Sequence, residues 1–158
     1  MSWRGTTTVS ERIFAALPYL LPLADGIGFG KFLFAQFPAL GLIFLPILPV
    51  INLYNSIPFA GFIVFFALFL LVVRNESINH FIRFNTMQAI LIDIILILCS
   101  LVVPILARGL QVQFVIEILF NMIFLGLLAA VIYSVVQSFR GLYAEIPTIS
   151  DAVHMQIR

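Results

Sequence analysis

Residues 74–92 read RNESINHFIRFNTMQAILI, a strongly polar stretch that lies between two apolar blocks and runs without a break into the second. Asp93 follows it, deeper in that second block. Membrane proteins normally separate their spans with a loop, whereas here amides, arginines and a histidine lead directly into an apolar run. The pattern predicts a helix that begins at the membrane surface and continues as a membrane span.

One face of this predicted helix is apolar and the other is polar. Ile78, Phe81 and Ile82 follow the i, i+3, i+4 spacing of a helix face, with the amide residues across from them. Arg74 and Arg83 carry long side chains whose charged ends can reach lipid headgroups while their stems stay in apolar surroundings. We therefore predict that these two arginines are interface anchors. A partner-docking or substrate-facing surface is the other interpretation of this segment.

Composition places the whole chain in a membrane. Hydrophobic residues make up 63% of its 158 residues and charged residues 9%, with a mean hydropathy of +1.17. Soluble domains have roughly 45–50% apolar and about 25% charged residues. We expect an all-α membrane protein that forms one polytopic domain over residues 1–158. The net charge of +1 comes from dispersed basic residues, so no nucleic-acid partner is expected.

Four membrane spans are predicted from the apolar runs, each of which must hold about 20 mostly apolar residues. The last three runs are uncharged or hold one acidic residue, Asp93 or Glu117. Ser10–Glu11, before the first apolar run, has the residue types of a helix start. The four spans are expected at approximately 10–29, 57–73, 87–107 and 114–138.

The position of the first span is the least certain part of this prediction. The apolar run 13–24 is short, at about 18 Å, whereas 37–54 is long but holds three prolines, which kink or end helices. The number of Lys and Arg residues on the two sides of the membrane distinguishes the arrangements. It is six against two if 13–24 spans, seven against one if only 37–54 spans, and five against three if both span. Both better-scoring arrangements have four spans and place the two termini on the cytoplasmic side. Because of the prolines, we favour 37–54 as a proline-rich re-entrant or membrane-embedded segment between the first two spans.

Polar residues inside the predicted spans are the candidates for function. Thr86, Asp93 and Ser100 are spaced at i, i+7 and i+14, which aligns them on one helix face, while Glu117 and Asn121 share a face of the last span. Such a stripe either lines a polar path or forms a helix–helix seam. The candidate path-lining or helix-interface residues are Asn79, Asn85, Thr86, Gln88, Asp93, Ser100, Glu117 and Asn121.

Catalytic, cofactor and metal sites are not expected. Cys99 is the only cysteine, and His80 and His154 have no partners at metal-ligand spacing. The glycines between 26 and 30 lack the spacing of a phosphate-binding loop and are expected to let the chain turn at the end of the first span. We predict a protein that is not an enzyme and that binds no cofactor.

Several motifs resemble those of the Tic-twenty family, small polytopic subunits of the translocon at the inner envelope of chloroplasts with cyanobacterial and plastid-encoded algal relatives. The likeness covers about residues 12–158. The motifs that carry it are FIRFNTMQAILID at 81–93, PFA at 58–60, VVRN at 72–75, LPYLLPL at 17–23 followed by Asp25–Gly26, and Ile146–Pro147.

The resemblance implies a four-helix membrane protein with stromal or cytoplasmic termini, located in the plastid inner envelope or in a cyanobacterial plasma or thylakoid membrane. It implies other translocon subunits and lipid as partners, with a preprotein as substrate, and it brings no catalytic residues. No transit peptide is apparent in the first ten residues, so a cyanobacterial or plastid-encoded chain is expected.

Two functions remain open from the sequence. The chain is either a translocon subunit that contributes to a preprotein-conducting path, or a structural or assembly protein of a membrane complex without an import role. A small-solute transporter is less favoured, because the proline-rich first half has no counterpart around Pro104.

Overall fold

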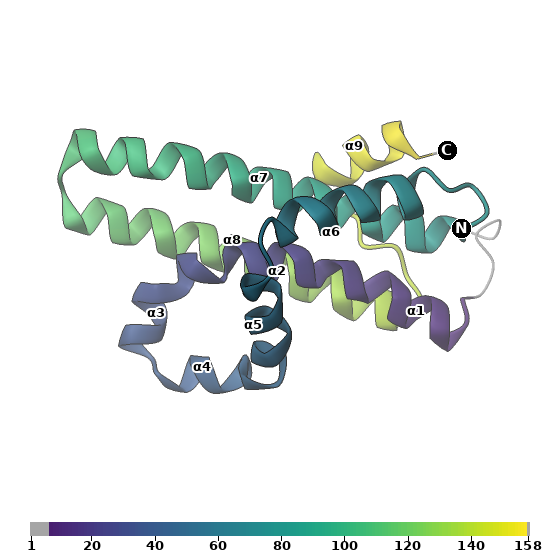
Figure 1. Ribbon diagram of the computed structural model, residues 1–158, viewed down its shortest axis with the longest axis horizontal. Helices are drawn as coiled ribbons and strands as arrows, with labels where there is room; N and C mark the ends of the chain where they lie inside the picture. The colour runs from purple at the N-terminus through teal and green to yellow at the C-terminus, as the bar shows by residue number, and fades with distance from the viewer. Residues whose placement is uncertain (1–6, 158) are drawn as a thin grey trace.

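The computed structural model describes residues 7–157, in which every regular element is a helix and there is no strand. Figure 1 shows two long helices, α7 (His80–Leu110) and α8 (Gln113–Phe139), packed side by side. Most other helices lie along one half of this pair, and a bracket of short helices projects from it. The predicted all-α class is therefore confirmed for the described residues. Arg4 and Arg158, which entered the charge count above, lie outside them.

The first helical run, Val9–Gln36, is interrupted by two 3₁₀ turns instead of being one uniform α-helix. It consists of α1 (Val9–Ala16), a 3₁₀ turn (Leu17–Tyr19), α2 (Leu20–Gly26), a second 3₁₀ turn (Ile27–Gly30) and α3 (Lys31–Gln36). Thr8 caps α1 and forms a capping box with Glu11. The helix cap thus lies two residues before Ser10, because the threonine hydroxyl satisfies the backbone N–H of Glu11.

The sequence suggested that the glycines between 26 and 30 turn the chain at the end of the first span. In the structure they lie within the helical run instead. All three have negative φ, since Gly141 alone among the described glycines has a positive one. Gly26 instead allows close packing, because a Cβ there would collide with Leu127 and lie 2.9 Å from Leu96. At Gly30 a Cβ would lie 2.8 Å from Phe124. These glycines let the first helical run approach α7 and α8.

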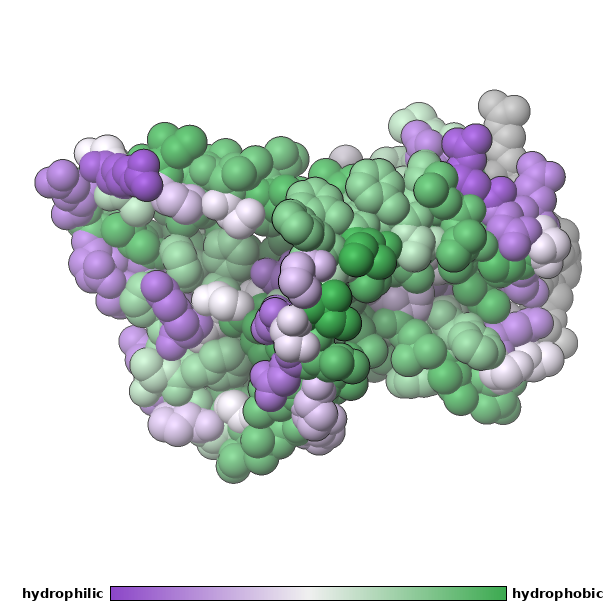
Figure 2. Space-filling model, viewed as in Figure 1, coloured by the Kyte–Doolittle hydropathy of each residue, from purple (hydrophilic) through white to green (hydrophobic). Residues whose placement is uncertain are grey.

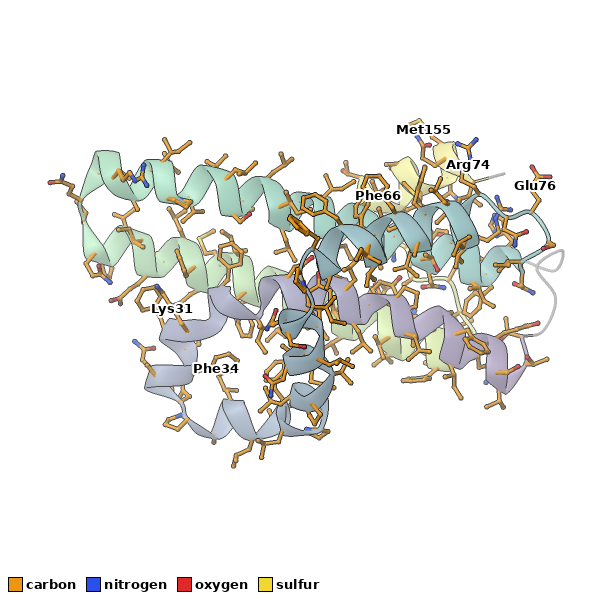
Figure 3. All side chains as sticks on the ribbon, viewed as in Figure 1. Lys31, Phe34, Phe66, Arg74, Glu76 and Met155 are labelled. Atoms are coloured by element: carbon orange, nitrogen blue, oxygen red, sulfur yellow. The ribbon has the colours of Figure 1, made fainter. Side chains whose placement is uncertain are left out.

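The proline-rich segment leaves the bundle and returns to it. α3, α4 (Ala39–Ile43) and α5 (Leu48–Ser56) form three sides of a bracket (Figure 1). A 3₁₀ turn, Leu45–Ile47, joins α4 to α5. Pro38, Pro46 and Pro49 lie at the starts of α4, the 3₁₀ turn and α5. Proline fixes φ and lacks a backbone N–H, so it ends the preceding helix and is tolerated in the first turn of the next. Phe34 points into the bracket (Figure 3). The centre of its ring lies 5.5 Å from the ring centre of Phe44 and 5.4 Å from that of Phe124.

A sharp break separates α5 from α6 (Ala60–Leu68), which continues as a π-helical turn, Phe69–Val73. The two helical pieces meet at 104°. Phe59 sits at the break with a φ of 58°, in the left-handed region that a bulky side chain rarely adopts. The segment expected as a straight span at 57–73 is therefore only nine residues of α-helix and five of π-helix.

α7 (His80–Leu110) and α8 (Gln113–Phe139) form a helical hairpin. α7 starts at His80, capped by the side chain of Asn79, so the polar segment is continuous with the apolar run only from residue 80 onward. Residues 74–79, which include Ile78 of the predicted helix face, form turns before the helix. Gln111 closes α7 in the left-handed region with a φ of 50°. An extended segment then leads from α8 to α9 (Ile149–Gln156), which packs on α7.

Three helical runs are long and apolar enough to cross a membrane, namely Val9–Gln36, His80–Leu110 and Gln113–Phe139. The bent pair Leu45–Ser56 and Ala60–Val73 makes a fourth if it is counted as one broken span. Figure 2 shows that the middle of the molecule is mainly hydrophobic on the face in view and that hydrophilic residues gather towards its two ends. This distribution is that of a protein embedded in lipid.

Two apolar cores hold the bundle together. The larger joins the first helical run to α7 and α8 through Tyr19, Phe29, Ala89 and Phe124. The smaller lies between the π-turn, α7 and α9 and includes Phe84 and Val153. Side chains buried in both cores come from α7, which is therefore the central helix of the fold.

Candidate functional site

Gln88 is the centre of a buried hydrogen-bond network. Its Nε2 lies 3.0 Å from the carbonyl oxygen of Ala144, 3.2 Å from the Tyr19 hydroxyl and 3.3 Å from Oγ of Ser134. Its Oε1 accepts a 2.6 Å hydrogen bond from the Ser150 hydroxyl. The side chain is fully buried, so these contacts replace the water that would otherwise solvate the amide.

Asn85 extends the network one turn towards the start of α7. Its Oδ1 accepts hydrogen bonds from the Tyr19 hydroxyl at 2.7 Å and from the Ser138 hydroxyl at 3.1 Å. Its Nδ2 donates to the carbonyl oxygen of Phe81 at 2.9 Å. We name this set the amide network; its members are Tyr19, Asn85, Gln88, Ser134, Ser138 and Ser150, and all are buried.

The amide network joins four parts of the chain around α7. The Ser150 hydroxyl also lies 3.1 Å from the Ala144 carbonyl oxygen and accepts a 2.6 Å hydrogen bond from the backbone N–H of Ile146. The extended segment after α8 and the start of α9 are thereby fixed to α7. Buried polar groups that are mutually satisfied hold helices in one arrangement. The amide network therefore fixes the neighbouring segments to α7 through hydrogen bonds.

Sequence reasoning found Asn85 and Gln88 but missed their partners. Tyr19 lies within a hydrophobic motif, and Ser150 follows a proline-containing loop. Ser134 and Ser138 carry a usable signal, because two hydroxyls at i and i+4 inside an apolar helix mark a face that hydrogen-bonds to another helix.

A second polar group lies at the junction of α2, α5 and α7. The carboxyl groups of Asp25 and Asp93 lie close to each other, and the Tyr54 hydroxyl donates a 2.6 Å hydrogen bond to Oδ1 of Asp25. Asp93 is 1% exposed, and its Oδ1 has no hydrogen-bond partner among residues 7–157. We name Asp25, Tyr54 and Asp93 the acidic cluster.

The acidic cluster opens into a cavity of about 550 Å³ between α5, α6 and α7. Most of its lining is apolar, with four phenylalanines from the break and from α6. Asn55 and Ser100 add polar groups to those of the cluster. In Figure 2 a hydrophilic patch lies where α5 meets α6, in the middle of a mainly hydrophobic face. Backbone that is not helical at membrane depth is tolerated where protein or a cavity covers it, and the break at residues 57–59 borders this cavity.

The structure divides the predicted stripe on α7 between these two surroundings. Thr86 is buried and its hydroxyl donates to the carbonyl oxygen of Ile82 at 2.8 Å. Asp93 belongs to the acidic cluster. Ser100 is exposed, lines the cavity and donates to the carbonyl oxygen of Ile97 at 2.7 Å. The stripe is therefore internal at its start and faces open space at its end.

The remaining candidate residues lie apart from both groups. Asn79 is exposed and caps α7 by accepting from the backbone N–H of Phe81 at 2.7 Å. Glu117 accepts from Gln113 at 3.3 Å, in the second turn of α8 rather than the first. Oδ1 of Asn121 is buried, with no hydrogen-bond partner among the described residues.

The two expected interface anchors differ in exposure. Arg74 is exposed at the end of the molecule that holds both termini (Figure 3), with its guanidinium 6.0 Å from the ring centre of Phe69. Arg83 is largely buried at 9% exposure, and its Nε donates a 2.9 Å hydrogen bond to the carbonyl oxygen of Val73. Arg83 thus satisfies a backbone acceptor at the end of the π-turn instead of extending freely towards headgroups.

The fold, its apolar surface and its two internal polar groups define an all-helical membrane protein. The family model described as "Chloroplast import apparatus Tic20-like" matches residues 8–153. The chain belongs to this Tic20 family, which confirms the resemblance seen in the sequence motifs.

Relatives in cyanobacteria, plants and algae are similar to the chain over nearly all of it. A Tic20 family protein of Synechocystis sp. is 50% identical over 163 residues, covering 100% of this chain and 99% of the relative. Protein TIC 20-II, chloroplastic, of Arabidopsis thaliana is 39% identical, covering 96% of this chain and 74% of the relative. The Tic20 family protein Ycf60 of Pyropia yezoensis is 34% identical, covering 96% and 77%.

Proposed function

We propose that the chain is a subunit of a protein translocon in the plastid inner envelope or in a cyanobacterial membrane, and that it contributes to a preprotein-conducting path. Family membership supports a role connected with chloroplast protein import, because the description of the family names the chloroplast import apparatus. Other translocon subunits would complete the path, since one small helical bundle encloses little space.

The observation that carries this proposal is the cavity at the acidic cluster. Asn85 and Gln88, two of the residues expected to line a path, are bonded inside the chain and fully buried. The polar groups available to a passenger are instead the exposed ones of the cavity, among them Asp25, Asn55 and Ser100. A path needs such groups in a mainly apolar lining, because they tolerate a moving polypeptide without holding it tightly.

The proposal includes four spans, with α5 and α6 together forming one broken span. Both described ends of the chain and the loop before α7 lie at one end of the molecule (Figure 1). Arg12, Arg74 and Arg140 belong to that end, whereas Arg108 belongs to the last turn of α7 at the other. Basic residues concentrate on the cytoplasmic side of membrane proteins. The termini are accordingly assigned to the stromal or cytoplasmic side.

Photocrosslinking to an arrested preprotein tests the proposal. A photoreactive amino acid would replace Phe62, which lines the cavity, and in a matched control Leu125, which is 55% exposed on α8. We expect adducts between the preprotein and position 62 and none at position 125. Adducts of position 62 with lipid or neighbouring subunits alone would reject the path.

A structural or assembly protein without an import role is the second candidate, and the amide network favours it. Six buried polar side chains hold the helices in one arrangement, as a scaffold requires. Gly126 offers a test, because it lies on the surface of α8 with nothing within 4 Å of an added Cβ. If the chain is a scaffold that uses this surface, Gly126→Leu removes it from its large complex on a native gel while the isolated chain keeps its melting temperature.

A further inference from the structure

The acidic cluster brings two carboxyl groups together from separate helices. Asp25 comes from α2 and Asp93 from α7, and Tyr54 of α5 supplies a hydroxyl to Asp25. Two carboxylates in contact repel each other unless a proton or another cation is present. Among residues 7–157 no arginine or lysine forms an ion pair with either carboxylate. The cluster therefore lacks a cationic partner within the described chain.

Asp93 also presents an unused acceptor. Its side chain is almost fully buried, yet Oδ1 has no hydrogen-bond partner among the described residues. A buried carboxylate oxygen without a donor is unfavourable. Asp93 is one of the residues that line the cavity, beside the exposed Asp25, so its carboxyl group lies at the cavity wall. This oxygen is a second feature, besides the pair of acids, that indicates a ligand.

The cavity suits a cation on an apolar stem. Its volume of about 550 Å³ lies within the range of ligand sites, roughly 300–1,000 Å³. The lining contains four phenylalanines besides the polar groups, namely Phe59, Phe62, Phe65 and Phe66. Aromatic faces attract ammonium and guanidinium groups, and they also pack against methylene chains. An ordinary metal ion would use neither the aromatic lining nor the apolar volume.

Depth in the membrane decides between two sources of such a cation. From His80 to Asp93 the helix rises about 20 Å, and from Asp93 to Leu110 about 25 Å, at about 1.5 Å per residue. The hydrocarbon core is about 30 Å thick, so Asp93 lies near its middle. The amine of a lipid headgroup does not reach this depth. The side chain of a polypeptide crossing the membrane does.

We propose that the acidic cluster binds the lysine or arginine side chain of an apolar polypeptide segment within the membrane. The methylene stem lies along the phenylalanines, and the charged end donates hydrogen bonds to Asp25 and Asp93. This inference rests on the proposed path and names the passenger chemistry that the path recognises.

Crosslinking of a synthetic peptide to the full chain in lipid vesicles tests the inference. The chain carries a photoreactive residue at Phe66, which lines the cavity. One peptide of about 20 leucines and alanines has a central lysine, and its matched control has a central methionine. We expect roughly tenfold more adduct with the lysine peptide, as charge-assisted hydrogen bonds provide. Asp25→Asn with Asp93→Asn removes the preference, whereas Asp151→Asn, at an exposed carboxyl group on α9 outside the cavity, keeps it.

Equal labelling by the two peptides would overturn the inference, as would a lysine preference that survives in the double variant. If the double variant does not run as a single species on size exclusion, Asp25→Asn alone decides, because this side chain is exposed to the cavity. The peptide assay uses no preprotein. If preprotein adducts form at position 62 but the peptides show no lysine preference, this binding site is rejected and the proposed path is kept. If the peptides show the lysine preference but no preprotein adduct forms at position 62, only the path is rejected.

Discussion

The Ser150 hydroxyl lies 2.6 Å from Oε1 of Gln88, although the two residues are 62 positions apart in the sequence. This contact lies inside the bundle and joins the start of α9 to α7. The same hydroxyl accepts from the backbone N–H of Ile146, so the loop before α9 is fixed with it. The C-terminal part of the described chain is thus an integral part of the bundle.

Gln88→Ala is expected to destabilise the fold substantially. The substitution removes four hydrogen-bond contacts and leaves buried partners on four other segments. At about 0.6 kcal/mol for each hydrogen bond in a membrane protein, the loss is about 2 kcal/mol. Thermal unfolding in detergent micelles measures it. Gln113→Ala, at the exposed start of α8, is the control, and an equal fall in melting temperature for both variants would contradict a central role for Gln88.

Ser150→Ala is expected to loosen α9 without unfolding the bundle. The loss of the bonds to Gln88 and to the backbone of residue 146 is worth about 1 kcal/mol. Hydrogen exchange in 149–156 should therefore accelerate about fivefold, while exchange in the middle of α7 stays unchanged. Met155→Ala, whose side chain is 76% exposed, serves as the control. Unchanged exchange in α9 of the serine variant would show that its apolar packing alone holds it.

Gly26→Ala and Gly28→Ala form a matched pair. A Cβ at residue 26 meets Leu127 and Leu96, whereas one at residue 28 meets nothing within 4 Å. We expect the first substitution to destabilise by about 1–3 kcal/mol through overpacking. The second is expected to be neutral or stabilising by about 0.5–1 kcal/mol, because alanine is the better helix residue. Melting temperatures in the same detergent distinguish them, and equal values would mean that the first helical run packs differently.

Thr8→Ala and Ser10→Ala separate two possible starts of α1. Thr8 forms both bonds of the capping box with Glu11, so its loss should cost about 1 kcal/mol and speed exchange in the first turn. Ser10 lies inside the helix, and its replacement should leave exchange unchanged. Faster exchange in the serine variant alone would place the helix start at residue 10.

The sequence predicted the helical class, because apolar length is a local property; the helices His80–Leu110 and Gln113–Phe139 contain the apolar runs 87–107 and 114–138. The break at Phe59 was missed, since an apolar run looks the same whether straight or bent. The first helical run extends beyond 10–29 because Gly26 and Gly30 serve packing, and packing partners such as Leu127 are distant in sequence.

The candidate site was predicted only in part for the same reason. Polar residues inside apolar runs drew attention to Asn85, Gln88 and Asp93. Whether such a residue faces a neighbour or a cavity depends on the partner helix, and neither Tyr19 nor Asp25 is near them in sequence. Only the folded chain separates the buried amide network from the open acidic cluster.

Thiol accessibility at residue 55 tests the proposed path most directly. In a Cys99→Ser background, Asn55→Cys places one thiol in the cavity lining, and Ile132→Cys places one on the exposed apolar surface of α8 as the control. In the assembled membrane, a water-soluble thiol reagent should modify position 55 and leave position 132 unmodified. An arrested preprotein should then protect position 55 from modification. A thiol at position 55 that reacts equally with and without the preprotein would contradict a preprotein path along this cavity.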